Sequence, residues 1–465
     1  MFDGYREPSG EDSAALVHLY EKLISEQSSP FFDSDQYEQI TEFYLQNDQI
    51  SKARDVVEYA LQQYPFATAL LLHYAHIKIY DNEIQEALEI AERVRLLEPS
   101  NPEVFVLLGN AYDEMGQYNM AIKEYEKALE FDSDKDDIYL YMAYSYENWD
   151  RYDKAIEVLK KALIENPENQ QALSELAFCC DFSDAEHDST GFLKTFIDDH
   201  PYSYMAWYSL GSIYIKQEKY SDALSCFDYA AIINPRYVPA HLNMGNIHFM
   251  NDNYEEAIEC FKKILAVSSE DIFALCYIAN CYKCLDNMRK AREFYKKAIK
   301  VDSNYSDAWY GLGTTYQQDN NHQVALEYFK KAIDLDKDDH SFWFSIAESY
   351  EELDKIDKAY ESYTKALDLD SSNVDYIKEF ALFLHDYSFE KEAQELLERA
   401  IEQQPEEVEL QLTMGGVLID KGMAHEAVFY LAEAKDLSEK AAQIFIEIFP
   451  HLEEHYLVRE VFNIR

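Results

Sequence analysis

The apolar residues of this chain follow a helical rhythm that repeats twice in every 34 positions. Within each unit they recur at i, i+3, i+4 and i+7, the spacing of an amphipathic α-helix, first over one segment and then, after a short turn, over a second. In the unit that begins at Pro102, the first face comprises Phe105, Leu108, Gly109 and Tyr112, and the second comprises Ala121, Tyr125 and Ala128. The pattern predicts a tandem array of helix pairs and no β-sheet.

Small residues mark the period in three columns. Every 34th residue from Ala75 to Gly415 is Ala or Gly, and Thr41 stands one period earlier. A second column runs from Ala53 to Ala427, with Ser189 as its one exception, and a third runs from Ala60 to Ala434, with Val94, Phe196 and Ile264 as exceptions. The register holds from residue 34 to 441 without an insertion. Such self-similarity is the signature of a repeat architecture.

The three columns predict close crossings between helices. Ala or Gly at a crossing lets two helix axes approach to about 8–10 Å, and large residues three or four positions away fill the space beside it. Aromatic residues form two further columns, and three of the four Trp residues share one position of the first helix; these are Trp207, Trp309 and Trp343. Proline recurs after the second helix, where it stops a helix.

These columns resemble the signature of the tetratricopeptide repeat family, with its Trp/Leu-Gly-Tyr first helix, Ala-Phe-Ala second helix and terminal Pro. The resemblance covers residues 34–441 as twelve units. It implies an all-α, right-handed superhelical solenoid of helix-turn-helix repeats whose first helices line a concave face. It also implies that the chain binds protein segments there.

One unit departs from the pattern. Residues 170–203 keep the length of a repeat, but Ser189 and Phe196 replace the small residues of the second helix. We expect either a displaced or shortened second helix, or a hinge or separate docking site. In each case this unit would divide the array into a four-unit N-terminal part and a longer C-terminal part.

Both ends of a repeat array need caps, because a terminal repeat leaves an apolar face in water. Residues 1–33 predict an N-terminal capping helix, with Phe31 and Phe32 closing its junction to the first repeat. Residues 442–465 predict C-terminal capping helices. This second segment is strongly apolar, so it either buries itself on the last repeat or docks on another chain, and self-burial is the favoured expectation.

Composition limits the class of protein and its partners. The 465 residues include 89 Asp+Glu and 41 Lys+Arg, a net charge of −48. This charge disfavours nucleic acid and anionic membranes as partners. The N-terminus lacks the basic and apolar regions of a signal peptide, no segment has the length of a membrane span, and seven Cys residues do not predict a disulfide framework. We therefore expect an acidic, cytoplasmic protein.

The charge is unevenly distributed. Residues 1–101 carry −12, residues 102–203 carry −15, residues 204–305 carry 0 and residues 306–465 carry −21. Acidic outer faces keep a long array dispersed. The neutral block between acidic flanks is alternatively part of a binding surface for a neutral to basic polypeptide segment.

The resemblance assigns groove-facing positions of the first helices to this block. The candidate partner-binding residues are Tyr208, Ser212, Asn243, Asn246, Tyr277, Asn280, Lys283 and Tyr310. Asn offers both a donor and an acceptor to a peptide backbone, and Tyr adds rigid apolar area with a polar tip. The Lys and Arg residues with which some family members grip a C-terminal carboxylate are nearly absent, since only Lys216, Lys283 and Lys378 occur, singly. A groove wall that merely tolerates polar residues would show the same pattern.

Candidate catalytic and metal motifs are weak. His451 and His455 flank Glu454 in the order of an inverted zinc-protease motif, but only ten residues remain for a third ligand. Cys281 and Cys284 lie inside one predicted helix rather than in a zinc knuckle. His73 and His76 are spaced for one helix face, and Asp334, Asp336 and Asp338 begin like a calcium loop but lack its Gly and Glu. We expect no enzyme, no metal and no cofactor.

Three hypotheses follow. The first is a non-catalytic scaffold that binds a partner segment in the concave groove. The second is a regulatory or assembly subunit held in a stable complex, or a homo-oligomer, through residues 442–465. The third and weakest is a metal-dependent enzyme that uses the C-terminal histidines.

Overall fold

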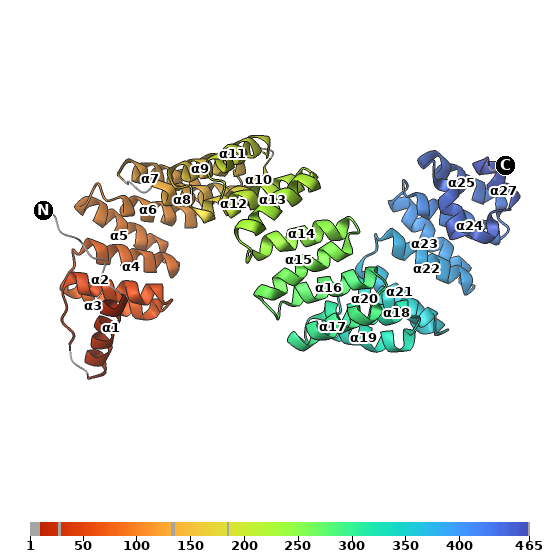
Figure 1. Cartoon of the computed structure of the whole chain (residues 1–465), viewed down its shortest axis with the longest axis horizontal. Helices are drawn as coiled ribbons and strands as arrows, with labels where there is room; N and C mark the ends of the chain where they lie inside the picture. The colour runs from red at the N-terminus through yellow and green to blue at the C-terminus, as the bar shows by residue number, and fades with distance from the viewer. Residues whose placement is uncertain (1–9, 27–28, 132–134, 184–185, 464–465) are drawn as a thin grey trace. The chain divides into compact units, whose positions relative to one another are not determined.

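The computed structural model is built from helices and the turns between them (Figure 1). It describes residues 10–26, 29–131, 135–183 and 186–463. Within these ranges there is no β-strand, which confirms the all-α repeat solenoid. None of the helices in these ranges is long and apolar enough to cross a bilayer.

Twelve helix pairs occupy most of the chain. The first helices are α2 (Ser34–Gln46), α4 (Thr68–Tyr80), α6 (Pro102–Glu114), α8 (Lys135–Asn148), α10 (Gln170–Phe182), α12 (Tyr204–Lys216), α14 (Val238–Met250), α16 (Ile272–Cys284), α18 (Ser306–Gln318), α20 (His340–Glu351), α22 (Val374–Asp386) and α24 (Val408–Asp420). The second helices are α3 (Ile50–Gln63), α5 (Ile84–Leu97), α7 (Tyr118–Phe131), α9 (Tyr152–Glu165), α11 (Glu186–Asp199), α13 (Tyr220–Ile233), α15 (Tyr254–Val267), α17 (Met288–Val301), α19 (His322–Leu335), α21 (Ile356–Leu369), α23 (Glu390–Gln403) and α25 (Ala424–Leu437). Every second helix begins 34 residues after the previous one, as the period predicts.

The turn inside each pair contains a left-handed residue that the sequence analysis missed. It recurs every 34th position from Asp48 to Gly422, with φ values of 55° to 77°, except at position 184, which lies outside the described residues. Asp, Asn or Gly fills most of these positions, because these residues reach the left-handed region at the lowest cost. The turn explains why a first helix ends where it does.

The small-residue columns lie at the predicted crossings. A Cβ atom added to Gly313 on α18 would lie 2.5 Å from Cε1 of Phe329 on α19, and one added to Gly211 would lie 2.7 Å from Cε1 of Phe227. In both pairs the ring follows the glycine by 16 residues. The aromatic column therefore packs directly on the column of Gly and Ala, and no larger side chain fits there without moving a buried ring.

The tryptophan position has a structural role. The indole Nε1 groups of Trp207, Trp309 and Trp343 each donate a hydrogen bond of 2.9–3.0 Å to a backbone carbonyl six residues earlier. The acceptors lie in the turn that precedes each first helix. This column therefore fixes the turn between consecutive repeats.

The irregular unit at residues 170–203 is more regular than expected. α11 has the same 14-residue length and the same register as the other second helices, so the expectation of a shortened helix was wrong. A displaced helix, a hinge or a docking site at this unit stays a prediction. Ser189 is fully buried at the small-residue position, and Phe196 is only 7% exposed. Serine is small enough to replace alanine at the crossing, and the Phe196 ring lies between Phe192 and His200.

The expected division of the array at this unit was also wrong. The chain forms two compact units, Met1–Ala240 (unit 1) and His241–Arg465 (unit 2), whose boundary falls inside α14. Within unit 1, α10 packs on both α9 and α12, and α11 packs on α12. Packing therefore continues through residues 170–203.

The helix that precedes the first repeat packs on it. Val17 and Tyr20 of α1 (Gly10–Ser25) are buried in one core with Tyr37 and Tyr44 of α2. Phe32 is buried in the same core as expected, whereas Phe31 is 80% exposed and does not close the junction. These contacts agree with a capping role for the described part of residues 1–33, which stays a prediction.

The C-terminal segment buries most of its apolar residues against the last repeat. It consists of α26 (Ala441–Ile448), a 3₁₀ turn at Pro450–Leu452 and α27 (Tyr456–Phe462). Phe445 and Val458 are fully buried, and the Phe449 ring packs on Gly416 of α24. Self-burial therefore accounts for the apolar character of this segment.

Candidate functional site

Side chains of consecutive first helices in unit 2 contact one another in a series that we call the first-helix ladder. The ladder consists of Lys283 with Thr314, Tyr310 with Ser345, Gln317 with Glu348, His340 with Tyr376, Lys378 with Glu409, and His385 with Asp420. These pairs are 31, 35 or 36 residues apart, about one period. Residues that meet on adjacent first helices are thus separated along the chain by three residues fewer than the 34-residue period, or by one or two residues more.

Six of the eight candidate residues lie in unit 2, on α14, α16 and α18. All six are half-buried; they are Asn243, Asn246, Tyr277, Asn280, Lys283 and Tyr310. Tyr277 stacks on Phe261 with a centroid distance of 5.0 Å, and Tyr310 lies 4.8 Å from the Phe342 ring. Burial raises the pKa of Tyr310, so its hydroxyl stays protonated and shares a 3.1 Å hydrogen bond with Ser345.

The other two candidates lie in unit 1 on α12. Tyr208 packs against Phe227 and Tyr237, with ring centroids 5.5 Å and 5.1 Å away. The Ser212 hydroxyl donates a 3.2 Å hydrogen bond to the backbone carbonyl of Tyr208. Both side chains are half-buried within their own unit.

Asn110 and Asn280 occupy equivalent positions in their repeats, and each accepts a hydrogen bond from a tyrosine of the second helix. The Asn110 side-chain oxygen accepts a 2.7 Å hydrogen bond from the Tyr125 hydroxyl, and Asn280 accepts one in the same way from Tyr295. The Asn280 oxygen is therefore occupied within its own repeat, and a role of Asn280 in partner binding stays a prediction. At Asn246 the corresponding ring is Phe261, which has no hydroxyl, and the Asn246 amide makes no hydrogen bond within the described residues.

The three lysines near these positions differ in their partners. Lys216 donates to the carbonyls of Cys180 and Ser183 at 2.7 Å and 3.1 Å. Lys378 lies within 4 Å of three carboxylates, described below. Within the part of the chain that the structure describes, the Lys283 amine has one polar contact, at 3.4 Å with Thr314, and burial lowers its pKa.

The net charge of zero in residues 204–305 has two sources, on first and second helices, that the sequence analysis did not distinguish. The first helices α12, α14 and α16 contain no Asp or Glu, whereas six of the basic residues of this block lie on the second helix α17. The first-helix positions are thus free of carboxylates, and the compensating positive charge is on α17, where most of these side chains are exposed.

The acidic flank in unit 2 carries half-buried carboxylates that sequence reasoning did not single out. Burial, followed by the charges of nearby carboxylates, raises the pKa values of Glu348, Glu351 and Glu379. Gln317 donates a 3.0 Å hydrogen bond to Glu348, and Tyr363 donates a 2.7 Å one to Glu351. The ladder spacing of 31 residues from Gln317 would have located Glu348.

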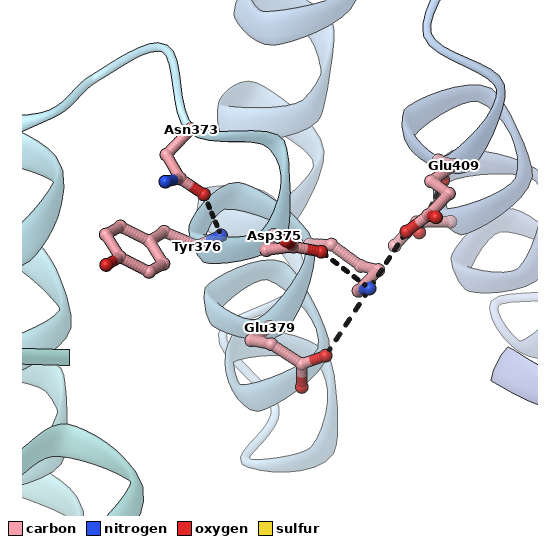
Figure 2. A network of polar contacts seen from close by, with 7 residues as sticks. Asn373, Asp375, Tyr376, Glu379 and Glu409 are labelled. Atoms are coloured by element: carbon pink, nitrogen blue, oxygen red, sulfur yellow. Dashed lines mark hydrogen bonds and ion pairs between the residues drawn. The ribbon is translucent and has the colours of Figure 1, made fainter. Parts of the chain in front are cut away.

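Figure 2 shows the polar network that joins α22 to α24 at this flank. Asp375 and Glu379 of α22 and Glu409 of α24 converge on one amine, that of Lys378, at 3.3, 3.7 and 2.8 Å. The Asn373 side chain caps α22 by accepting a 3.2 Å hydrogen bond from the backbone N–H of Tyr376. Lys378 is therefore occupied by carboxylates of its own chain.

The candidate motifs at the C-terminus and on α16 form no metal or catalytic cluster in the described residues. The His451 imidazole pairs with Asp420 at 3.0 Å. Cys281 is buried, Cys284 is exposed, and both are free thiols. The expectations of no enzyme, no metal at these motifs and no cofactor stay predictions.

Sequence-family models match the repeats along the chain. The model of YpiA-like C-terminal tetratricopeptide repeats matches residues 341–407, and tetratricopeptide repeat models match residues 237–304, 270–338, 204–237 and 136–169. A further TPR repeat model matches residues 109–148. Together these matches cover more than half of the chain. The chain belongs to the tetratricopeptide repeat family.

Several solved structures are similar to this chain at low identity and low TM-score. Yeast Tom70 is 15% identical, with 93% of this chain and 100% of that chain covered and a TM-score of 0.44. Cut9 with Hcn1, an APC/C hetero-tetramer, is 14% identical, with 97% and 93% covered and a TM-score of 0.40. MamA is 23% identical, with 35% and 95% covered and a TM-score of 0.33. Comparison with curated proteins gave no significant match.

Because Asn246 and Asn280 have different neighbours, replacing each by alanine is expected to change the stability of the chain by a different amount. Asn280→Ala should lower the free energy of unfolding by about 1–3 kcal/mol, because it leaves the buried Tyr295 hydroxyl without an acceptor. Asn246→Ala should change it by less than about 0.5 kcal/mol, as for surface substitutions. Urea unfolding measures both.

A double substitution controls for other effects of losing Asn280. Tyr295→Phe restores the arrangement that Asn246 and Phe261 already have, so Asn280→Ala should cost little in that background. Equal costs of Asn280→Ala with and without the Tyr295 hydroxyl would contradict the assigned role.

A second prediction concerns Glu147 on α8 in unit 1. Burial, with a smaller contribution from Glu175, raises its pKa to about 7, although it accepts a 3.2 Å hydrogen bond from the Cys179 thiol. The native state therefore binds more protons than the unfolded state between the unfolded pKa and about 7, and stability falls as the pH rises through that window.

Glu147→Gln removes the carboxyl group whose ionisation lowers the stability of the native state as the pH rises. We expect it to raise the free energy of unfolding by about 1 kcal/mol above pH ~7, since the group is half-buried and solvent screening reduces the effect. Near pH ~4.5 the gain should vanish. The exposed Glu165→Gln is the control, and a gain from Glu147→Gln that does not depend on pH would contradict the stated cause.

Proposed function

We propose that this chain is a non-catalytic scaffold that binds a partner polypeptide along the first-helix face of α14, α16 and α18 in unit 2. The partner segment is extended or helical and neutral to basic in charge. The resemblance to the tetratricopeptide repeat family, whose members bind protein segments, supports a partner of this class. Tyr208 and Ser212 of α12 are proposed to serve the same role within unit 1.

The Asn246 amide carries this proposal. It is half-buried on a helix without carboxylates, and it makes no hydrogen bond in the described part of the chain, whereas tyrosines occupy Asn110 and Asn280. A half-buried amide with an unused donor and acceptor matches one peptide group of a partner backbone. Lys283 and the ring of Tyr277 supply a neighbouring donor and apolar area.

Charge supports the expected character of the partner. Lys216 and Lys378 are engaged by groups of their own chain, so a clamp for a C-terminal carboxylate has at most Lys283. Burial is the main cause of the raised pKa values of Glu348, Glu351 and Glu379, and the charges of neighbouring carboxylates raise them further, so several acidic groups lie close together on the adjoining helices. Basic side chains of a partner would offset the negative charge of these groups.

Selection of peptides on the full chain tests the proposal. Peptides displayed on phage are selected on the immobilised protein, and their affinities are then measured against the wild type and Asn246→Ala. Loss of one hydrogen bond should weaken binding by about 1 kcal/mol, roughly fivefold. Asn304→Ala, an exposed turn substitution, is the control. Selected peptides that bind both variants equally would place the site elsewhere.

The alternative of a stable assembly through residues 442–465 is less favoured. It relied on apolar side chains in this segment, and most of them pack on α24 and α25 of the same chain. Tyr456, which is 63% exposed, is the main exception.

A further inference from the structure

Three potential metal ligands meet on the first helices of unit 1. Glu38 and Glu42 stand one turn apart on α2, so their side chains share a face. His73 on α4 approaches this face, and its Nε2 atom lies 3.8 Å from Oε1 of Glu42. One ligand atom from each of the three residues lies within 4.8 Å of the other two.

The ligand set follows from the geometry of the ladder. His73 is 35 residues after Glu38 and 31 after Glu42. These are the spacings by which Tyr310 reaches Ser345 and Lys283 reaches Thr314 in unit 2. Two carboxylates one helical turn apart therefore both point at the same residue of the next first helix.

The two carboxylates have no other partner that would compete with a cation. Within the described residues, neither the Glu38 nor the Glu42 carboxylate forms an ion pair with Lys or Arg or accepts a hydrogen bond. Their oxygen lone pairs are therefore available to a metal ion.

The histidine side chain presents a ring nitrogen to the two carboxylates. His73 is half-buried, and its Nε2 atom faces the Glu42 carboxylate. The neutral imidazole of a histidine offers a lone pair on such a nitrogen to a metal ion.

We propose that Glu38, Glu42 and His73 form a binding site for a divalent transition-metal ion of the Zn²⁺ class. The mixed nitrogen and oxygen donors suit Zn²⁺, Ni²⁺ or Co²⁺, whereas Mg²⁺ and Ca²⁺ prefer oxygen ligands alone. Tetrahedral ligands at about 2.0–2.1 Å from the ion lie about 3.4 Å apart. Rotation of the exposed Glu42 side chain closes the 3.8 Å separation to this value.

Three protein ligands leave one coordination position open. Water fills it in the isolated chain, and a donor atom of a bound protein could replace that water. The proposal does not depend on the function proposed for unit 2.

Isothermal titration of the full chain with Zn²⁺ tests the proposal. The protein is prepared without a polyhistidine tag, treated with a chelator and titrated in millimolar Mg²⁺, which saturates non-specific carboxylate sites. We expect one Zn²⁺ per chain, and we expect Glu38→Gln and His73→Asn each to weaken binding more than about tenfold. Co²⁺ should give the visible absorption of a four-coordinate site.

His76→Asn and Glu83→Gln are the matched controls, because each changes the same type of residue outside the three-ligand set. Circular dichroism checks that all variants keep their helix content. The proposal is overturned if Mg²⁺ abolishes Zn²⁺ binding, which would indicate surface carboxylates only. Equal losses in the control and ligand variants would also overturn it.

Discussion

Replacing Gly313 by leucine is expected to destabilise the repeats around α18 by about 3 kcal/mol or more. Even the first added carbon would lie 2.5 Å from the Phe329 ring and 3.3 Å from the carbonyl of Ala325. Phe329 is fully buried and cannot move aside without displacing its own neighbours. Urea unfolding followed by circular dichroism measures the loss.

Gly191→Leu is the matched control for this prediction. Gly191 is also helical, on α11, but nothing lies within 4 Å of a Cβ added there. Leucine should leave the stability of α11 unchanged or raise it, because it forms helix better than glycine by about 0.8 kcal/mol. If both substitutions had the same effect, the glycine column would not mark helix crossings.

Truncating Phe445 to alanine is expected to cost about 3–5 kcal/mol in the last repeats, the usual penalty for removing a buried ring. Phe445 is fully buried in the core that α26 shares with α24 and α25. The measurement is the unfolding of this region, followed by hydrogen exchange because repeat arrays unfold in parts.

The exposed Tyr456 provides the contrast. Tyr456→Ala should change stability by less than about 0.5 kcal/mol and leave the mass from light scattering unchanged. A wild-type oligomer that Tyr456→Ala dissociates would instead support assembly through residues 442–465. Deletion of the whole segment does not discriminate, since it exposes the apolar surface of the last repeat and would itself promote association.

The packing of an aromatic ring on a glycine explains why the helices of each repeat and their pairing could be predicted from the sequence. The small residue at a crossing, such as Gly313, and the ring that fills it, such as Phe329, are separated by a fixed 16 positions. Local spacing alone therefore specified both the helices and their pairing. At residues 170–203 the same reasoning did not predict a second helix of full length, because it overlooked that a buried serine substitutes for alanine in volume.

The candidate site was predicted less completely. The sequence placed Asn246 and Asn280 in equivalent positions, and the structure gives them different roles because their neighbouring rings are Phe261 and Tyr295. A difference of one hydroxyl group on the second helix decides whether an amide is available. Periodicity therefore predicts where a residue lies in its repeat, but not which side chain it contacts.

By itself, the sequence determined the helices, their 34-residue register and the small residues at their crossings, since these depend on neighbours within one repeat. Only the tertiary structure decided which side chains of consecutive first helices meet, such as His73 with Glu38 and Glu42. It also decided where the apolar C-terminal segment is buried. The physical reason is that contacts between repeats depend on how each helix pair is rotated against the next, and this rotation comes from the packing of side chains rather than from their spacing along the chain.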